Sequence, residues 1–235
     1  MIKFNQVSFS YNNLVIIDNF TQEFENNKIH TIIAPSGAGK TTLLNLAAKL
    51  IKPQKGIIEN LPEKVSYIFQ EDRLIDELTI YQNLELVIKK TNKDKKQRKL
   101  LIDSWLKQVD LENYGNKYPS QLSGSMKRRV ALVRAFIHPS QLILMDEPLT
   151  GLDINLKQEI INYLIKLWNK QKRTILFVTH NIDEALLLSN DIYVYSQKPM
   201  ILKKHIEISK DLSERKLSKN SFSKERKVIY KTFEA

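Results

Sequence analysis

The stretch APSGAGKTT (34–42) constrains the fold more than any other part of this chain. It fits the phosphate-binding pattern G-x-x-x-x-G-K-[ST] at Gly39, Lys40 and Thr41, while Ala34 stands where the pattern has its first glycine. The pattern has chemical meaning only between a buried strand and a helix. The run IHTII (29–33), which is expected to be a buried strand, precedes it, and the helical run TTLLNLAAKLI (41–51) follows it. The sequence therefore predicts a strand–loop–helix unit that binds a phosphorylated nucleotide.

The residues of this loop have separate expected tasks. Consecutive backbone N–H groups cradle phosphate oxygens, and the following helix adds the positive end of its dipole. Lys40 is expected to reach the β- and γ-phosphates, and the Thr41 hydroxyl to bind Mg²⁺. Ala34 would cost on the order of 1–2 kcal/mol if its position required a positive φ, but it removes no ligand. The predicted nucleotide-binding residues of the loop are Ala34, Pro35, Ser36, Gly37, Ala38, Gly39, Lys40, Thr41 and Thr42.

A second candidate element is the acidic end of the run LILMDEP (142–148). An aspartate at the tip of a buried strand faces the ligand-binding edge of a parallel sheet. Asp146 is therefore expected to hold Mg²⁺ through water, and Glu147 to polarise the water that attacks the γ-phosphate. The alternative is an acidic turn before Pro148 without such a role. The presence of the phosphate loop, whose Lys40 lies 106 residues before Asp146, argues against that alternative.

The order of strand-like and helix-like runs predicts an α/β fold. Before the loop, short runs broken by Asn pairs indicate antiparallel strands and hairpins. After it, SYIFQ (66–70), LILMD (142–146) and TILFVTH (174–180) are typical of strands that alternate with helices, which favours a mainly parallel sheet covered on both faces. The segment at about 71–140 is mostly helical and is predicted to be an insertion into this core. We expect one domain over 1–210 and a peripheral, basic C-terminal tail over 211–235.

The segment YPSQLSGSMKRRVALVRAFIHP (118–139) predicts a helix that is capped by Ser123 and ends before Pro139. Its apolar stripe consists of Met126, Val130, Val133 and Ile137. Three basic residues lie off the stripe: Lys127, Arg128 and Arg129. The Ser-Gly-Ser at the start of this helix is either a simple cap or an anion site, because free backbone N–H groups collect at a helix N-terminus.

Taken together, these elements resemble the ATP-binding cassette (ABC) ATPases, a family of P-loop NTPases. LSGSM (122–126) is similar to the family signature LSGGQ, 34–42 to Walker A, 142–147 to Walker B, and LTGLD (149–153) to the D-loop. Tyr11 corresponds to the aromatic residue that stacks on adenine, although an ordinary surface tyrosine is the alternative. Gln70 corresponds to the Q-loop glutamine and His180 to the switch histidine. The resemblance covers nearly the whole chain, and four of its six glycines lie inside these motifs.

The resemblance implies an ABC ATPase fold, with a P-loop NTPase core, an N-terminal antiparallel β subdomain and a helical insertion, that binds ATP and Mg²⁺. Glu147 would be the general base and His180 would contact the γ-phosphate. Gln70 would join Thr41 and Asp146 in the coordination of Mg²⁺.

Cassettes of this family work as head-to-tail pairs, which implies a second copy of the chain or a paralogous cassette as partner. Each signature would then cap the nucleotide bound to the other cassette, and Asp153 of the D-loop would cross the interface. The signature residues are Leu122, Ser123, Gly124, Ser125 and Met126. Ser125 replaces a signature glycine, and its hydroxyl could either crowd the γ-phosphate or hydrogen-bond to it.

No run approaches ~18 consecutive apolar residues, so the sequence predicts no membrane span. The resemblance therefore implies a separate integral membrane permease. FQEDRLIDELTIYQNL and VTHNIDEALLLSNDIYVYS look like segments of importer ATPases for nitrate, sulfonate, taurine and thiamine precursors. Such a resemblance implies ATP hydrolysis coupled to import at the cytoplasmic face of the cell membrane, with an extracytoplasmic solute-binding protein as an indirect partner. Residues 71–88 would receive the permease.

The basic residues bear on the alternatives. The formal charge is +11, and the excess lies in 89–99, with seven basic residues and one acidic, and in 197–235, with eleven and five. This distribution favours solvated segments over a nucleic-acid-binding face, so no nucleic acid partner is expected. Contact with anionic lipid head groups is a second interpretation of these segments. The alternative function is that of a non-transport ABC ATPase acting on nucleic acid or the ribosome.

Overall fold

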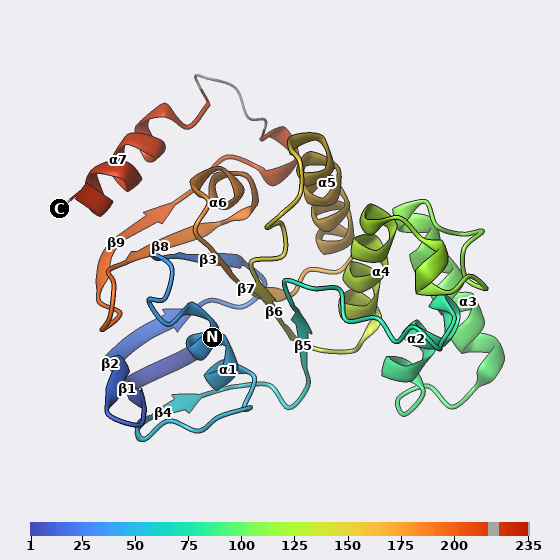
Figure 1. Ribbon diagram of the computed structural model, residues 1–235, viewed down its shortest axis with the longest axis horizontal. Coiled ribbons are helices and arrows are strands. Elements are labelled where there is room, and N and C mark those ends of the chain that lie inside the picture. Colours follow the sequence, from blue (N-terminus) through green and yellow to red (C-terminus); the bar gives the residue numbers. More distant parts are fainter. Residues whose placement is uncertain (216–220, 235) are drawn as a thin grey trace.

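The computed structural model describes residues 1–215 and 221–234. Two sheets with helices packed against them make up this part of the chain (Figure 1). The smaller sheet is antiparallel, with the strand order β2-β1-β4. Its strands are β1 (Ile2–Tyr11), β2 (Leu14–Phe24) and β4 (Lys55–Glu59). Its inner face is aromatic, because Phe4 makes edge-to-face contacts with both Phe20 and Phe24. The expected N-terminal antiparallel β subdomain is confirmed.

The larger sheet has six strands in the order β5-β6-β7-β3-β8-β9. All neighbours are parallel except β8 and β9, which pair antiparallel at one edge. The strands are β3 (Ile29–Ile33), β5 (Val65–Ile68), β6 (Leu142–Asp146), β7 (Thr174–Thr179), β8 (Asp191–Tyr195) and β9 (Leu202–Glu207). Strands covered on both faces are apolar along their whole length rather than alternating. The apolar runs within β6 and β7 follow from this position. Strand β3 also buries His30 and Thr31, whose side chains bond to the Glu25 carbonyl and to the Ser189 hydroxyl.

Alternate residues of the central strands belong to two different cores. Leu142 and Leu144 of β6 pack with helix α1 (Lys40–Ala47) and with the antiparallel sheet. Ile143 and Met145 point to the opposite face, where they pack with α4 (Gly124–Ile137) and α5 (Ile154–Lys170). Since successive side chains of a strand point to opposite faces, one strand contributes to both cores. Helix α1 and the phosphate loop are thereby held between the two sheets.

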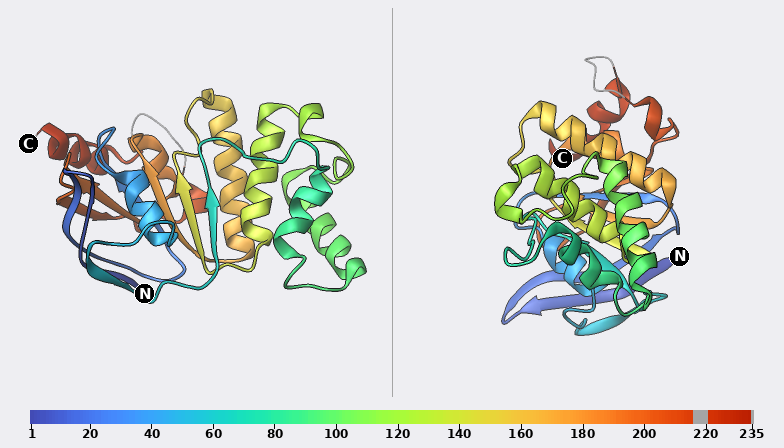
Figure 2. Two further views of the ribbon diagram at one scale, coloured as in Figure 1. Left: turned by 60° about the horizontal axis from the view of Figure 1, so that its bottom comes forward. Right: turned by 90° about the vertical axis from the view of Figure 1, so that its right-hand side faces the viewer.

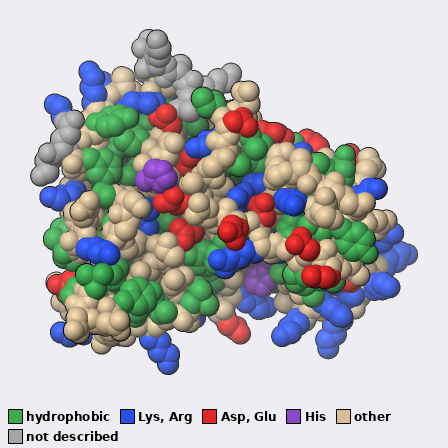
Figure 3. All heavy atoms as spheres, in the orientation of Figure 1, with side chains coloured by type: hydrophobic (Ala, Val, Ile, Leu, Met, Phe, Trp, Pro, Cys, Tyr) green, Lys and Arg blue, Asp and Glu red, His purple; other side chains and the backbone are tan. Residues whose placement is uncertain are grey.

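The helical insertion forms a block at one end of the molecule (Figures 1 and 2). It contains α2 (Ile80–Ile88), α3 (Lys95–Leu106) and α4, with the short 3₁₀ turns η1 (Lys107–Val109) and η2 (Pro119–Gln121). Trp105 is buried in this block and Trp168 in α5, where its indole donates to the Arg173 carbonyl. The lysines of 89–99 are exposed, and Lys and Arg side chains gather over this end in Figure 3. The lysines of the basic run are thus a solvated surface, whereas Arg98 is buried and bonds to Glu85.

The C-terminal segment is attached to the core through its last helix. After η3 (Leu212–Glu214), the chain ends in α7 (Ser223–Glu234), which lies at the opposite end of the molecule from the helical insertion (Figure 2). Ile229 of α7 is fully buried against α6 (Ile182–Leu188), and Arg226 pairs with Asp183 of α6 at 2.6 Å. Part of the expected tail, 216–220 and 235, lies outside the described residues. No helix in the described ranges has the length and apolarity that a membrane crossing needs.

Candidate functional site

The phosphate loop connects β3 to α1 with the backbone that the motif requires. Gly37 and Gly39 have φ values of +75° and +114°, in the left-handed region that glycine adopts without a Cβ clash. Gly39 is also the N-cap of α1, and a Cβ at this position would lie 2.7 Å from Cγ2 of Ile16 in β2. Both conformation and packing therefore require glycine at position 39.

Ala34 carries none of the strain that its substitution for glycine would cause at a positive φ. Its φ is not positive, and its side chain is buried in the core shared by α1 and the two sheets. Alanine at this position therefore has ordinary backbone geometry, and its methyl group fits the core without the strain of a positive φ. The departure from the pattern thus leaves the loop geometry intact.

Lys40 lies almost fully buried under the loop that precedes it. Its ammonium group donates to the carbonyl oxygens of Ala34 at 3.0 Å and Pro35 at 3.2 Å. The same Nζ lies 3.4 Å from Oε1 of Glu147. The ammonium group is thus held by two loop carbonyls and paired with one carboxylate at the mouth of the loop. The geometry suits a cation that receives phosphate oxygens.

Glu147 is the residue on which the site converges. Its backbone has a φ of +46°, which is uncommon for a non-glycine residue and is found mainly where function fixes the conformation. Oε2 accepts hydrogen bonds from Nδ1 of His180 at 3.0 Å and from the hydroxyl of Thr150 at 3.2 Å. Burial raises the pKa of Glu147, but the His180 hydrogen bond and the charge of Lys40 outweigh it, so that the pKa lies below its ordinary value. The carboxylate is therefore ionised at neutral pH.

The ionised Glu147 determines which ring nitrogen of His180 bears the hydrogen that lies between them. An ionised carboxylate can only accept hydrogen bonds, so Nδ1 of His180 carries the proton that lies against Glu147. The opposite ring nitrogen, Nε2, is left for another partner, and the side chain is 56% exposed. His180 is thus oriented by Glu147 at the open rim of the site.

Asp146 and Thr41 are the two predicted metal ligands that lie side by side at this edge of the sheet. Burial raises the pKa of Asp146, the hydrogen bond to Thr41 opposes this shift, and the neighbouring charge of Glu147 adds to it. The hydroxyl of Tyr67 also lies 3.4 Å from Oδ2 of Asp146. The carboxylates of Asp146 and Glu147 and the hydroxyl of Thr41 form a set of oxygen donors. Such a set suits Mg²⁺, which takes one or two carboxylates and completes its shell with water and phosphate. The residues present therefore fit Mg²⁺.

A pocket of about 380 Å³ opens over these groups. Its walls come from the loop, from α1, from Glu147 and from the hairpin between β1 and β2. The lining residues are Tyr11, Leu14, Ile16, Ser36, Gly37, Gly39, Lys40, Thr41, Thr42, Glu147 and Lys198. Tyr11 is half exposed, its ring in edge-to-face contact with Phe9 at 4.9 Å. An aromatic face at the edge of a phosphate-binding pocket is available to stack on a purine.

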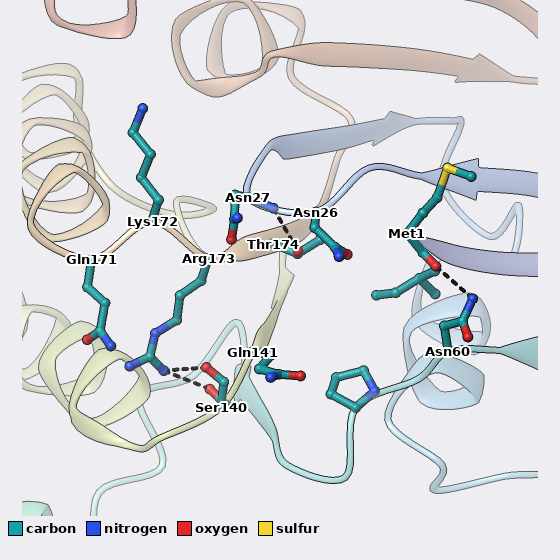
Figure 4. Close-up of a pocket in the computed structure, with 12 residues that line it drawn as sticks. Met1, Asn26, Asn27, Asn60, Ser140, Gln141, Gln171, Lys172, Arg173 and Thr174 are labelled. Carbon is teal, nitrogen blue, oxygen red and sulfur yellow. Dashed lines mark hydrogen bonds between the residues drawn. The ribbon is translucent and has the colours of Figure 1, made fainter.

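A larger pocket of about 540 Å³ lies elsewhere (Figure 4). Gln141 precedes β6 and Thr174 begins β7, so this pocket is at the amino ends of the parallel strands. The guanidinium group of Arg173 points to Ser140 there and donates to its carbonyl and hydroxyl oxygens, a structural contact. Ligands of open α/β sheets bind at the carboxyl ends of the strands. The smaller pocket over the phosphate loop is therefore the candidate site.

Several residues expected in the site lie outside this pocket. Gln70 is exposed beyond the end of β5, which stops at Ile68 rather than continuing to residue 70. Asp153 caps α5 by accepting from the Leu156 N–H at 3.0 Å. Ser123 caps α4 in the same way, through Met126, and is exposed together with Gly124. One chain alone does not bring the signature, the D-loop or Gln70 to the phosphate loop.

The structure also shows site residues that the sequence did not reveal. Thr150 and Lys198 belong to this group, and so does Tyr67, which lay inside the predicted strand SYIFQ without an assigned role. Arg128, which lies off the apolar stripe of its helix, is buried and donates to the carbonyl oxygens of Phe69 and Gln70. Helical periodicity shows which side chains lie off the stripe, and it contains no information on a loop that folds over them.

Ser125 hydrogen-bonds within its own turn. Its hydroxyl lies 3.1 Å from that of Ser123, on an exposed stretch of chain. We expect Ser125→Gly to leave thermal unfolding within a few degrees of the wild type, because surface substitutions usually change stability by less than about 0.5 kcal/mol. ATPase activity should be unchanged or higher, as measured by phosphate release. A sharp loss of activity in a folded variant would show instead that the hydroxyl is used on the nucleotide.

Comparison with known proteins agrees with this geometry. The sequence model of the family described as ABC transporter matches residues 17–150. The formylaminopyrimidine import ATP-binding protein ThiZ of Halalkalibacterium halodurans is 33% identical, over 100% of this chain and 95% of that protein. The aliphatic sulfonates import ATP-binding protein SsuB of Bacillus cereus is 34% identical, over 93% of this chain and 88% of that protein. The taurine import ATP-binding protein TauB of Pelagibacter ubique is 35% identical, over 77% and 70%.

Solved structures give the same assignment. The dimeric structure of a bacterial ABC transporter cassette has a TM-score of 0.75 and 28% identity, and it covers 90% of this chain and 100% of that one. A post-hydrolysis state of the same cassette, bound to ADP and phosphate, has a TM-score of 0.73 and 26% identity, over 90% and 100%. Family, relatives and fold therefore agree with the phosphate loop and its convergent carboxylates, and this chain belongs to the ABC transporter family as one of its ATP-binding ATPase cassettes.

Proposed function

We propose that this chain is the ATP-hydrolysing subunit of an ABC importer and that it powers a separate membrane permease for a small solute. The observation that carries the proposal is the convergence of Lys40 and His180 on Glu147, at the mouth of the phosphate loop. A cation for the phosphates, an ionised base and an oriented histidine are the groups that phosphoryl transfer to water needs. ATP and Mg²⁺ are the proposed substrate and cofactor.

Each group has a proposed task in the reaction. The backbone N–H groups of the loop and Lys40 bind the phosphates of ATP, and Tyr11 stacks on the adenine. Glu147 accepts a proton from the attacking water, and His180 contacts the γ-phosphate. Thr41, Asp146 and, after rearrangement of its exposed side chain, Gln70 hold Mg²⁺, which supplies neutralisation of the phosphate charge when bound.

Completion of the site needs a second cassette. Ser123 and Gly124 of the signature are exposed, and so is Asp153, while Ser125 and Met126 are partly buried. All of them lie outside the pocket of their own chain. We propose that they cap the nucleotide of a partner, either a second copy or a paralogous cassette, in a head-to-tail dimer. A related cassette has a dimeric structure, which supports this arrangement.

The partner in transport is proposed to be an integral membrane permease, so the cassette works peripherally at the cytoplasmic face of the membrane. The names of the relatives favour import of a small solute in the sulfonate, taurine or thiamine-precursor class. The loop and helix at 71–88 would receive the permease, and an extracytoplasmic solute-binding protein would deliver the solute.

Uptake measurements test the proposed solute class. Cells with and without this chain would be compared for uptake of radiolabelled taurine, an alkanesulfonate and a formylaminopyrimidine. Uptake of at least one of them should be lost, restored by the wild-type chain and not restored by Lys40→Ala. Unchanged uptake of all three would contradict the solute class. RNA binding by the purified chain that weakens steeply as the salt concentration rises would favour the nucleic-acid alternative instead.

A further inference from the structure

Tyr67 lies between the candidate metal ligand and the loop that follows β5. Its hydroxyl donates to Oδ2 of Asp146 at 3.4 Å. Its ring is stacked on Phe69, with 4.1 Å between centroids and 10° between planes. The guanidinium group of Arg73 lies 3.7 Å over the ring of Phe69. Three stacked planar groups thus connect the loop at 69–73, called the Q-loop below, to the carboxylate of Asp146.

The Q-loop is in turn bonded to the signature helix. Arg128, in the second turn of α4, donates to the carbonyl oxygen of Phe69 at 3.0 Å and to that of Gln70. Its Nε lies 3.1 Å from Oδ1 of Asp72, and only 6% of the arginine side chain is exposed. A buried planar guanidinium that binds two successive carbonyls fixes orientation as well as distance, because its donors form a rigid fork.

A second arginine of α4 holds the far end of the Q-loop. Arg134 donates to the carbonyl oxygens of Arg73 at 2.7 Å and Asp72 at 2.8 Å. Four of the five Q-loop carbonyls, all except that of Glu71, are therefore bonded to one helix. A displacement of α4 must move the Q-loop with it or break these bonds.

We propose that Arg128 and Tyr67 are positioning residues that transmit the position of the signature helix to the Mg²⁺ ligand Asp146. Arg128 fixes the Q-loop backbone on α4, Phe69 carries this position to the ring of Tyr67, and the Tyr67 hydroxyl orients the carboxylate. The inference rests on the proposed role of Asp146 as a metal ligand. Hydrogen bonds to ligating carboxylates orient them, and their loss typically weakens metal binding or activity about 10–100-fold.

Nucleotide affinity measured with and without the metal separates this role from a merely structural one. The probe is a fluorescent trinitrophenyl derivative of ATP, titrated in excess Mg²⁺ and, separately, in EDTA. Tyr67→Phe keeps the stacked ring and removes only the hydroxyl. We expect it to raise the Kd in Mg²⁺ by about tenfold and to leave the Kd in EDTA unchanged.

Arg128→Lys keeps the charge but lacks the rigid planar fork of donors that orients the two carbonyls. It should raise the Kd in Mg²⁺ in the same direction, without an effect in EDTA. If both residues act through one path, the double variant should be no worse than the weaker-binding single variant, since residues in one network are not additive. Additive effects would overturn the relay.

The neighbouring arginine provides a matched control. Arg129 lies on the same helix but donates to the Val109 carbonyl and the Tyr163 hydroxyl, away from the Q-loop. Arg129→Lys should leave the ratio of the two Kd values unchanged. Equal weakening in Mg²⁺ and EDTA for Tyr67→Phe, or no weakening in either, would contradict the proposal.

The assignment of the metal ligand is tested separately. In Asp146→Asn the difference between the Kd values in Mg²⁺ and EDTA should disappear. If the difference persists in Asp146→Asn, the ligand assignment fails, whatever Tyr67→Phe shows. If it disappears there but Tyr67→Phe behaves as wild type, the proposed function stands and the relay is wrong.

Discussion

We expect the variant Glu147→Gln to bind ATP and to hydrolyse it at least about 100-fold more slowly, the lower end of what a general base contributes. The amide keeps the size of the side chain and can still accept from Thr150, which donates to Oε2 in the wild type. It cannot take a proton from water. Phosphate release under saturating Mg-ATP measures the loss. Since the bound ATP persists, sizing of this variant with and without Mg-ATP should also show a shift from monomer to dimer.

A glutamate with no part in the site gives the matched control. Glu112 is exposed after η1, so Glu112→Gln makes the same change of charge without an effect on turnover. Wild-type turnover in Glu147→Gln would remove Glu147 as the base. A dimer would mean that the loop with Ala34 and the signature with Ser125 both work. A monomer with ATP bound would place the defect at Ser125, or show that the permease or a second cassette is needed.

Replacing Lys40 by alanine abolishes tight binding of ATP. In the free protein the ammonium group is buried and bonds to two loop carbonyls, so it stands where phosphate oxygens enter. Hydrogen bonds to charged groups are worth about 1.5–3 kcal/mol each, and loss of the contacts to two phosphates should raise the Kd by about 100-fold or more. Titration with the fluorescent ATP derivative measures the change.

Lys49 provides the comparison for Lys40. It lies just past the end of α1, where its ammonium group also donates to carbonyl oxygens, those of Leu61 and Pro62, but on the surface. Lys49→Ala should leave the affinity for ATP at the wild-type value. An unchanged affinity in Lys40→Ala would show that the loop does not bind the nucleotide phosphates.

The sequence was most informative where backbone environment and residue type are directly linked. The runs IHTII and LILMD form β3 and β6, because strands buried on both faces are largely apolar. Ser123 was predicted as the cap of α4 and does accept from the Met126 N–H, since a serine hydroxyl satisfies a free donor of the first turn. These are local relations that a short window of sequence contains.

The remaining features depend on segments that are distant in the sequence. Arg128 is buried because the Q-loop, 58 residues earlier at Gln70, returns to accept its donors. Ile229 lies in a basic helix, and it is fully buried because apolar side chains of α6 pack against it together with Ile206 and Ile208. Tyr67 meets Asp146 because β5 and β6 are neighbours in the sheet. Contacts between segments far apart in the sequence bring these groups together, and such contacts could not be predicted from the sequence pattern.

The contact of Gly39 with Ile16 has a consequence for how cassettes can be recombined. Ile16 lies on β2 and Tyr11 on β1, so the antiparallel sheet forms one wall of the nucleotide pocket and shares its core with α1. A chimera with its junction between β2 and β3 would join a phosphate loop from one parent to a wall from another. The smallest exchangeable unit is therefore the antiparallel sheet together with the loop and α1, inherited as one piece.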